Sequence, residues 1–468
     1  MKDNATTSTA GGDMSRRRFM GAAAAATAAF TNGCFYNSVP APVPRSVLGG
    51  PGHVPPSEKL NIAGVGVGGR GSSNMRALSD EKQNIVALCD VDWSHASGTF
   101  ERYPDAKKYK DFRIMLDKED KNIDAVVVST ADHCHAVASM AAIKRGKHVY
   151  CEKPLTHDIY EARMIAKAAR EAGVATQMGN GGQASEERRL VAEYIWAGAI
   201  GPVREVHIWT DRPNRGVFGE YWPQGVDRPK DTPPVPGTLD WDLWLGPAPE
   251  RPYHPAYLPF KWRGWWDFGT GALGDIGCHR FDPAVRALKL GAPLTVEACS
   301  TRVNKETYPL GSIVTYHFGA RGDMPPLKFV WYDGGLKPPR PEGMDEGWQM
   351  GTNGTLYIGD KGVMAGHVVM PRARRAEFGR PPKVIPRSPG HYTEWINACK
   401  GGEPAGSNFD HAGPMTETVL LGNVALRMDM RQKLFRTALQ WDAEKMEFPN
   451  VGEANQYVQR EYRKGWTL

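Results

Sequence analysis

The sequence lacks the cysteine patterns that hold small metal sites and disulfide-rich folds together. Its 468 residues include seven cysteines, and none of them forms a Cys-x-x-Cys pair. A structural zinc site needs such closely spaced ligands, and a disulfide framework needs many cysteines in a short chain. The sequence therefore predicts neither a zinc framework nor a disulfide-stabilised fold.

Long apolar runs, charge blocks and internal repeats are also missing. No stretch approaches the ~18 consecutive apolar residues that span a bilayer, and no repeat has the period of a solenoid or propeller. The net charge of +6 is spread thinly apart from the N-terminus and residues 372–375, so nucleic-acid binding is not indicated. What remains is an ordinary globular composition in a chain long enough for two domains.

Residues 1–57 are predicted to be a signal peptide followed by a linker. Paired arginines precede Phe19 and an alanine-rich run, which is the order of a twin-arginine signal, and a mitochondrial-type or disordered basic tail is the alternative. Cys34 follows an imperfect lipoprotein cleavage sequence and is a candidate lipid acceptor. The Pro- and Gly-rich residues 39–56 form the linker. We expect export by the twin-arginine machinery to the periplasm, or at least out of the cytoplasm, after folding in the cytoplasm.

Residues 58–178 alternate apolar strands with helices, as in a doubly wound parallel α/β sheet of the Rossmann type. Gly64, Gly66 and Gly69 follow the first strand and fit G-x-G-x-x-G, whose glycines let a pyrophosphate approach a helix N-terminus. Asp90 ends the second strand, where a carboxylate hydrogen-bonds the ribose hydroxyls and repels a 2′-phosphate. The motif therefore favours NAD over NADP.

Two further motifs follow in the order and spacing of a known family. One runs from Thr130 to His135, and the other ends in Glu152-Lys153-Pro154. Together with the glycine motif they resemble the Gfo/Idh/MocA oxidoreductases, named for glucose–fructose oxidoreductase and inositol dehydrogenase. The resemblance covers the chain from about residue 60 onward. It implies that Thr130, His135 and Glu152 help hold the cofactor, and that Lys153 lies beside the nicotinamide and the substrate hydroxyl.

Three further residues in or beside these motifs leave alternatives open. Arg70 follows the glycines, where its guanidinium would contact the cofactor and soften the preference against NADP. His133 and Cys134 could offer metal ligands, but a third or fourth ligand is not visible in the sequence. We therefore expect no metal site and interpret these two residues as part of a loop.

Residues 179–468 change pattern, because a helix is followed by long strands. This order predicts an α+β domain with an open, mainly antiparallel sheet. The expected strands are residues 203–211, 295–303, 312–318, 327–332 and 354–358. The family resemblance implies such a sheet and contacts between subunits through its exposed face, so we expect a homo-oligomer.

The stretch from Gly269 to His279 is the strongest signal in this second half. Its glycines precede a helix on which Asp275 and His279 stand four residues apart, and therefore on one face. Histidine exchanges protons near neutral pH, and a nearby carboxylate can orient it. The stretch resembles the family's second motif, in which these two residues contact the sugar. We predict Lys153, Asp275 and His279 as the catalytic residues.

Half of the 14 tryptophans lie between Trp209 and Trp266, interleaved with proline and glycine. Exposed aromatic rings suit carbohydrate faces, but rings in a long loop also pack into a core of their own. Weaker candidates for substrate contacts are Asn180, Arg263, Trp265 and Asp267. Residues 181–183 read Gly-Gly-Gln and depart from the Gln-Gly-His that related sequences often show.

Three functions are compatible with these motifs. The first is an exported NAD-dependent oxidoreductase acting on a sugar, glycoside or polyol hydroxyl. The second is a glycoside hydrolase that recycles tightly bound NAD through oxidation, elimination, hydration and reduction, which suits export because free NAD is not expected outside the cytoplasm. Lys153 favours the first, since the family's known glycosidase branch tends to lack that lysine. A non-catalytic sugar or NAD sensor is the third and least favoured.

Overall fold

The computed structural model describes residues 58–214, 219–302, 304–429 and 437–468. The predicted signal peptide, linker and Cys34 lie outside these residues. Residues 58–468 form a single compact unit. Within the described ranges, every helix is too short or too polar to cross a membrane.

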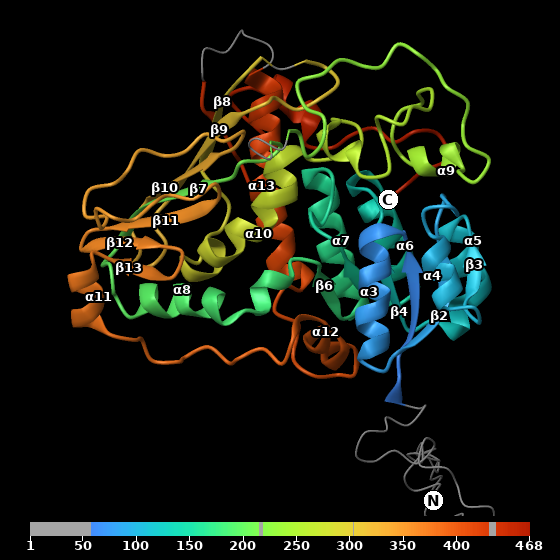
Figure 1. Cartoon of the computed structure of the whole chain (residues 1–468), viewed down its shortest axis with the longest axis horizontal. Helices are drawn as coiled ribbons and strands as arrows, with labels where there is room; N and C mark the ends of the chain where they lie inside the picture. The colour runs from blue at the N-terminus through green and yellow to red at the C-terminus, as the bar shows by residue number, and fades with distance from the viewer. Residues whose placement is uncertain (1–57, 215–218, 303, 430–436) are drawn as a thin grey trace, which may run out of the picture. The chain divides into compact units, whose positions relative to one another are not determined.

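The first half of this unit is a six-stranded parallel sheet in the order β3-β2-β1-β4-β5-β6 (Figure 1). Its strands are β1 Asn61–Val65, β2 Asn84–Cys89, β3 Lys107–Tyr109, β4 Ala125–Val128, β5 His148–Cys151 and β6 Thr176–Met178. The connecting helices are α3 Gly69–Asp80, α4 Ser97–Arg102, α5 Phe112–Glu119, η2 Asp120–Asn122, α6 Asp132–Ile143 and α7 Ile159–Ala172. Strand β4 is buried on both faces because its side chains alternate between two hydrophobic clusters. This confirms the predicted doubly wound sheet.

The second half contains an eight-stranded sheet in the order β13-β12-β11-β7-β10-β9-β8-β14. Its strands are β7 Val203–Trp209, β8 Thr295–Ser300, β9 Ser312–Phe318, β10 Leu327–Tyr332, β11 Gly354–Gly359, β12 Gly362–Ala365, β13 Val368–Met370 and β14 Leu439–Gln440. Strands β7 and β10 pair in parallel, and the other described pairs are antiparallel. This confirms the predicted mainly antiparallel sheet.

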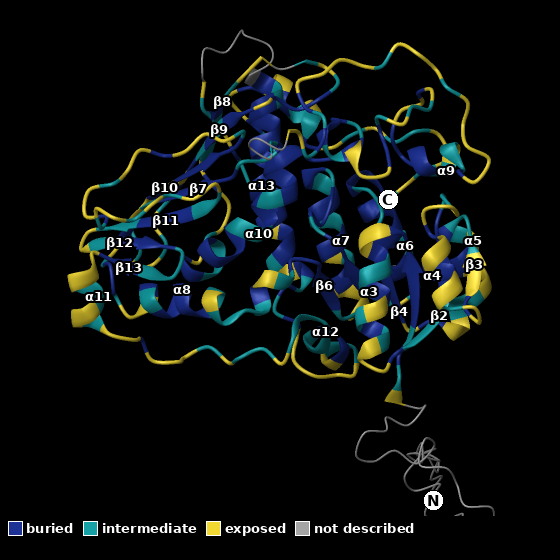
Figure 2. Cartoon of the chain, viewed as in Figure 1, coloured by how far each residue is buried: buried dark blue, intermediate teal, exposed yellow. Residues whose placement is uncertain are grey.

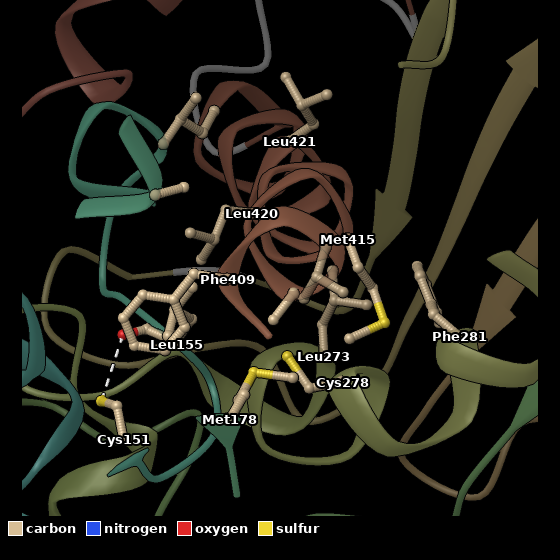
Figure 3. Packing of buried hydrophobic residues seen from close by; sticks show 14 of the residues in the cluster. Cys151, Leu155, Met178, Leu273, Cys278, Phe281, Phe409, Met415, Leu420 and Leu421 are labelled. Carbon is tan, nitrogen blue, oxygen red and sulfur yellow. Dashed lines mark hydrogen bonds between the residues drawn. The ribbon is translucent and has the colours of Figure 1, made fainter. Parts of the chain in front are cut away.

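Some helices of the second half pack against one side of this sheet, and others pack against the first half. They are η3 Gly181–Ala184, α8 Glu186–Trp196, α9 Trp241–Leu245, η5 Lys261–Gly264, α10 Gly271–Ala287, α11 Arg372–Phe378, α12 His391–Cys399, α13 Phe409–Asp429 and η6 Gly452–Tyr457. Most of α10 and α13 is buried (Figure 2). Figure 3 shows Cys151, Leu155 and Met178 of the first half beside Leu273 and Cys278 of α10. The two halves therefore share one core.

The opposite side of the eight-stranded sheet has an apolar part and a polar part. In the apolar part, Met344 and Trp348 from the loop after β10 pack with Trp209 and Leu356 of the strands. In the polar part, Glu205 pairs with neighbouring side chains of the sheet. The chain thus covers much of the apolar surface of this face itself, and the homo-oligomer stays a prediction.

Candidate active site

A cavity of about 670 Å³ lies at the carboxyl ends of the parallel strands and extends to α10. This is the edge where open α/β sheets bind their ligands. The predicted residues in its wall are Gly66, Gly69, Arg70, Asp90, Thr130, His135, Glu152, Lys153, Arg263, Asp275 and His279. The structure thus brings the motifs of both halves of the chain to one site.

Four predicted residues lie outside this wall. Gly64 is part of β1, and its Cα faces Met75 of α3. Trp265 is 1% exposed in a hydrophobic cluster, and its indole N–H donates to a backbone carbonyl. Asp267 accepts a hydrogen bond from Arg251. Asn180 is fully buried, and neither atom of its side-chain amide has a hydrogen-bond partner among the described residues.

The glycine loop between β1 and α3 has no room for side chains at two positions. Gly66 has φ +77°, and a Cβ there would lie 2.7 Å from the backbone N of Thr130. A Cβ on Gly71 would lie 1.9 Å from the carbonyl O of Gly66. The loop therefore packs directly on the first turn of α3, whose backbone N–H groups are available to a phosphate. Bare backbone of this kind fits the pyrophosphate of a dinucleotide.

Asp90 holds this loop in place. Its Oδ2 accepts hydrogen bonds from the backbone N–H groups of Val67 at 2.8 Å and Gly68 at 3.0 Å, and its Oδ1 accepts one from Asp92 at 3.0 Å. Burial raises the pKa of Asp90, while these backbone donors oppose the rise. The sequence predicts a ribose contact here, and the structure adds a second role, because the same carboxylate ties β2 to the glycine loop.

His135 joins the loop after β4 to the Glu-Lys-Pro segment. Its Nδ1 lies 2.7 Å from the carbonyl O of Pro154, and its Nε2 lies 3.1 Å from the carbonyl O of Thr130. Both partners are acceptors, so the ring donates to both only when it is protonated. Burial alone would lower the pKa of His135, but the neighbouring Cys151 and Asp132 raise it to about 10. His135 is therefore a buried cation that positions the loop beside the cavity.

Glu152 is held in a network that reaches the second half of the chain. It accepts hydrogen bonds from Nε of Arg70 at 2.9 Å and from Nδ2 of Asn74 at 3.0 Å. Tyr392 of α12 in turn donates to Oδ1 of Asn74 at 2.7 Å. Burial opposes the charge of Glu152, but Arg70 outweighs it and lowers the pKa of the carboxyl. The residue before Lys153 is thus fixed and ionised.

Lys153 meets α10 through Asp275. Its Nζ donates to Oδ1 of Asp275 at 2.6 Å and to the backbone carbonyl of the same residue at 3.0 Å. Nε of Arg263 donates to the same Oδ1 at 2.8 Å, while its guanidinium stacks on Trp262 and Phe260 at 4.1 Å from each ring centre. Burial would raise the pKa of Asp275, but Lys153 and Arg263 hold it well below its usual range. Lys153, Arg263 and Asp275 therefore form one linked group of charges in this part of the wall.

His279 follows Asp275 by one helical turn and also lines the cavity. The sequence predicts that Asp275 orients it, whereas in the structure that carboxylate bonds to Lys153 and Arg263. Among the described residues, His279 has no hydrogen-bond partner. Burial and the charge of Lys153 lower its pKa to about 4. The imidazole is therefore neutral near pH 7 and able to accept a proton.

The sequence motifs do not indicate several other residues of the cavity wall. Tyr221 and Phe260 lie in the tryptophan-rich stretch, and His95 lies beside the glycine loop. Only the aromatic composition of that stretch could have indicated the first two. Of the tryptophans, Trp244 and Trp262 reach the cavity, although both are 9% exposed and pack in a hydrophobic cluster. In the part of the chain that the structure describes, no group of three or more His, Cys, Asp or Glu side chains is placed to hold a metal ion.

Two family models match the chain, one in each half. Residues 60–180 match GFO_IDH_MocA, an oxidoreductase family with an NAD-binding Rossmann fold. Residues 218–317 match the C-terminal alpha/beta domain of the same oxidoreductase family. The two matches follow the order of the two sheets along the chain.

The curated relatives match over shorter stretches. Inositol 2-dehydrogenase of Salmonella typhimurium is 30% identical over 112 residues, which are 23% of this chain and 33% of the relative. The 1,5-anhydro-D-fructose reductase of Ensifer adhaerens is 42% identical over 82 residues, 18% of this chain and 25% of the relative. The chain therefore spans a third or less of the length of these two relatives.

Solved structures match over most of the chain. The WlbA dehydrogenase from Bordetella pertussis, in complex with NADH and UDP-GlcNAcA, has a TM-score of 0.55 and 16% identity over 82% of this chain and 99% of its own. GenD2 from gentamicin A biosynthesis, in complex with NAD, has a TM-score of 0.54 and 18% identity over 82% of this chain and 97% of its own. At these identities the likeness shows the fold.

The glycine loop and the parallel sheet agree with the first match, which describes an NAD-binding Rossmann fold. Residues 60–180 and 218–317 therefore match the two models of the Gfo/Idh/MocA oxidoreductases, the family that the motifs resemble. The glycine loop, which has no room for side chains at Gly66 and Gly71, and the carboxylate of Asp90 fit NAD. NAD is the cofactor in the description of the family model that matches residues 60–180.

Proposed function

We propose that this protein oxidises a hydroxyl group of a sugar, glycoside or polyol by hydride transfer to NAD. One observation carries the proposal: a neutral His279 and the Lys153–Asp275 pair line the cavity that the glycine loop also lines. NAD supplies the hydride acceptor when it is bound. The names of the relatives, among them an inositol 2-dehydrogenase and a levoglucosan dehydrogenase, support the substrate class.

The side chains of the site have separate roles in the proposed reaction. His279 takes the hydroxyl proton, because its lowered pKa keeps it unprotonated near neutral pH. Lys153 stabilises the negative charge that develops on the substrate oxygen in the transition state. Asp275 places the ammonium group of Lys153, and Arg263 holds Asp275. Thr130, Glu152 and Arg70 would line the cofactor side, with Glu152 fixed by Arg70 and Asn74.

The proposal also covers the compartment in which the protein acts, how it keeps its cofactor, and its oligomeric state. We propose twin-arginine export, NAD that stays tightly bound, and a homo-oligomer through the eight-stranded sheet. Lipid attachment at Cys34 is part of the export proposal. Tight binding follows from export, since a protein outside the cytoplasm does not meet fresh NAD. A glycosidase that recycles its bound NAD also needs no fresh cofactor, so it is the second candidate. The presence of Lys153 favours the oxidoreductase.

One experiment separates the two candidates. The purified protein is denatured and the released NAD(H) is quantified, and the native protein is incubated with a glycoside panel without added cofactor. Release of aglycone without net NADH contradicts the simple dehydrogenase. NADH that accumulates only with added NAD contradicts the recycling glycosidase.

Lys153→Met tests the assignment of the lysine. The variant loses the charge at the substrate oxygen but none of the glycine-loop contacts, so we expect turnover to fall at least about 100-fold while NAD binding is kept. Lys167→Met, an exposed lysine of α7, is the matched control and keeps full activity. Activity of Lys153→Met within a few-fold of the unmodified protein would end this assignment.

A further inference from the structure

The cavity follows the carboxyl edge of the parallel sheet from β5 to β3. Lys153 follows β5, whereas the wall residues Val91 and Lys110 follow β2 and β3, so the strand order β3-β2-β1-β4-β5 puts them at the opposite end. In a doubly wound fold the carboxylate that ends β2 contacts the ribose of the adenosine half of NAD. The end of the cavity beside β2 and β3 is therefore its adenosine end.

Residues 238–245, a segment of the second half that contains α9, pair with the first half at this adenosine end. The backbone N–H of Asp240 donates to the carbonyl O of Val91 at 2.9 Å. The backbone N–H of Trp93 donates to the carbonyl O of Thr238 at 3.2 Å. Between these two bonds the segment and the loop after β2 form an antiparallel β-bridge. The segment is therefore tied directly to the loop after β2.

The first turn of α6 and the C-terminal tail hold the other end of the segment. The carbonyl O of Trp244 lies 3.0 Å from Nε2 of His133 in α6. Arg463 in the tail forms an ion pair with Asp242, and its Nε donates to the carbonyl O of Gly246 at 3.1 Å. Figure 1 shows α9 next to the C-terminal end of the chain. Contacts from three parts of the chain thus fix the segment in place.

Two side chains of the segment, Leu243 and Trp244, are part of the cavity wall. Leu243 is only partly buried, whereas Leu245 is buried in a hydrophobic cluster. The first half adds the apolar wall residues Val91, Phe112 and Cys134. Apolar and aromatic walls suit a flat base such as adenine. The adenosine end is therefore an apolar pocket lined by both halves of the chain.

We propose that residues 238–245 form a cover over the adenosine half of NAD, with Leu243 as an adenine contact, and that this cover slows the release of the dinucleotide. The cover is already fixed by protein contacts, so binding does not pay the entropy of ordering it. Most differences in affinity between related complexes lie in the dissociation rate, which is the rate that such a cover controls. The inference rests on the proposed function, because it gives a cause for the tight NAD binding proposed there.

The release rate of bound dinucleotide tests the cover. The protein is loaded with NADH and mixed with a large excess of NAD, and the loss of bound-NADH fluorescence is followed. Leu243→Ala removes apolar contact with the adenine, so we expect NADH release to be at least about tenfold faster. Leu336→Ala, which shortens an exposed leucine after β10, is the matched control and should release NADH at the unmodified rate. An unchanged rate in Leu243→Ala would overturn the proposal.

A dinucleotide with an enlarged base tests where the cover acts. In nicotinamide 1,N6-ethenoadenine dinucleotide a further ring is fused to the adenine. We expect the unmodified protein to bind this analogue at least about tenfold more weakly than NAD, and Leu243→Ala to reduce the difference to about threefold or less. Equal affinities of the unmodified protein for the two dinucleotides, or a difference that Leu243→Ala leaves unchanged, would overturn the proposal.

A second variant loosens the segment from its exposed side. Arg463→Gln loses the ion pair with Asp242 and the hydrogen bond to Gly246, so we expect NADH release to become about threefold faster or more. Release at the unmodified rate would contradict the fixing of the cover by the tail. Melting temperatures of all variants, measured with NADH bound, show whether a faster release comes from the cover or from a loss of folding.

The same measurements keep this inference separate from the proposed function. A protein that releases NADH faster in Leu243→Ala but forms no NADH with any sugar supports the cover and contradicts the oxidoreductase. A protein that oxidises sugars, and whose NADH release is unaffected by Leu243→Ala, supports the oxidoreductase and contradicts the cover.

Discussion

At the scale of single residues, the site is a small group of side chains whose charges shift the pKa values of their neighbours. Asp275 stays ionised because Lys153 and Arg263 both donate to its Oδ1. His279 stays neutral because it is buried near the charge of Lys153. The neutral imidazole of His279 is therefore able to accept a proton, as the proposed hydride transfer requires.

The pH dependence of the reaction should follow His279. Its pKa in the folded protein is about 4, below the 6.5 of an unperturbed histidine. The neutral form is the base, so kcat/KM should fall as the pH drops through about 4 rather than through about 6.5. The same shift destabilises the fold between these values, because the unfolded chain binds this proton first as pH falls. The measurement is a pH profile of kcat/KM together with denaturation at each pH.

Removal of the neighbouring charge provides the control for this assignment. Lys153→Met deletes a cation that lowers the pKa of His279, so the pKa should rise in the variant. A titration of the histidine ring signals by NMR measures this shift without turnover. An unchanged pKa in the variant would contradict the stated cause.

At the scale of elements, the glycine loop and the C-terminal tail position the parts of the chain that surround the cavity. The loop between β1 and α3 has no space for a Cβ at Gly71. The tail after η6 returns to the first half, where Arg460 donates to Glu161 of α7 at 2.7 Å and to the carbonyl of His133. The first element forms the cofactor side of the cavity, and the second holds the helices behind it.

Gly71→Ala should disrupt cofactor binding. Its Cβ would lie 1.9 Å from the carbonyl O of Gly66, so the loop must move away from the end of α3. We expect NAD affinity to fall at least about tenfold, since such backbone shifts cost about 1–3 kcal/mol. Gly98→Ala is the matched control, because no atom lies within 4 Å of a Cβ built there. Equal NAD affinity of the two variants in a fluorescence titration would contradict this account of the loop.

Arg460→Met should destabilise the fold. Arg460 neutralises Glu161, whose side chain is fully buried, and lies 3.6 Å from Asp158. Loss of the cation leaves buried carboxylates unpaired, a change that typically costs about 3–5 kcal/mol. The control is Lys167→Met, which removes a lysine that is 61% exposed and pairs with Glu171 on the surface. Urea denaturation of both variants should give a large loss for the first and about 0.5 kcal/mol or less for the second.

At the scale of the whole molecule, the two halves share one hydrophobic core and one cavity. A single cluster of buried residues runs from Val65 in β1 through α10 to Phe329 in β10. The ion pair between Lys153 and Asp275, two predicted catalytic residues, crosses the same boundary. Cofactor and substrate residues therefore keep their relative positions only while both halves are folded.

Residues 58–468 should accordingly unfold in one cooperative step. NAD binds only the folded state, so 100-fold excess over its Kd should add about 2.7 kcal/mol of stability. The calorimetric transition should move to higher temperature as a single peak, by a few degrees for a chain of this size. Two separate transitions, with only one of them sensitive to NAD, would contradict a shared core.

The sequence by itself determined the features that depend on local pattern. Alternating apolar strands and helices identified the Rossmann sheet, and spacing identified the glycines and the shared helical face of Asp275 and His279. The resemblance to the family implied the roles of these two residues and of Lys153. Strand β13 was missed, because a stretch of three residues has no measurable period. The predicted helical face was right, since Asp275 and His279 both reach the cavity.

Tertiary structure alone decided which of these residues touch. Asp275 bonds to Lys153, 122 residues away, rather than orienting His279, four residues away. Trp265 packs in the core while its near neighbour Trp262 reaches the cavity. Contacts of this kind depend on the packing of elements, which local periodicity does not encode.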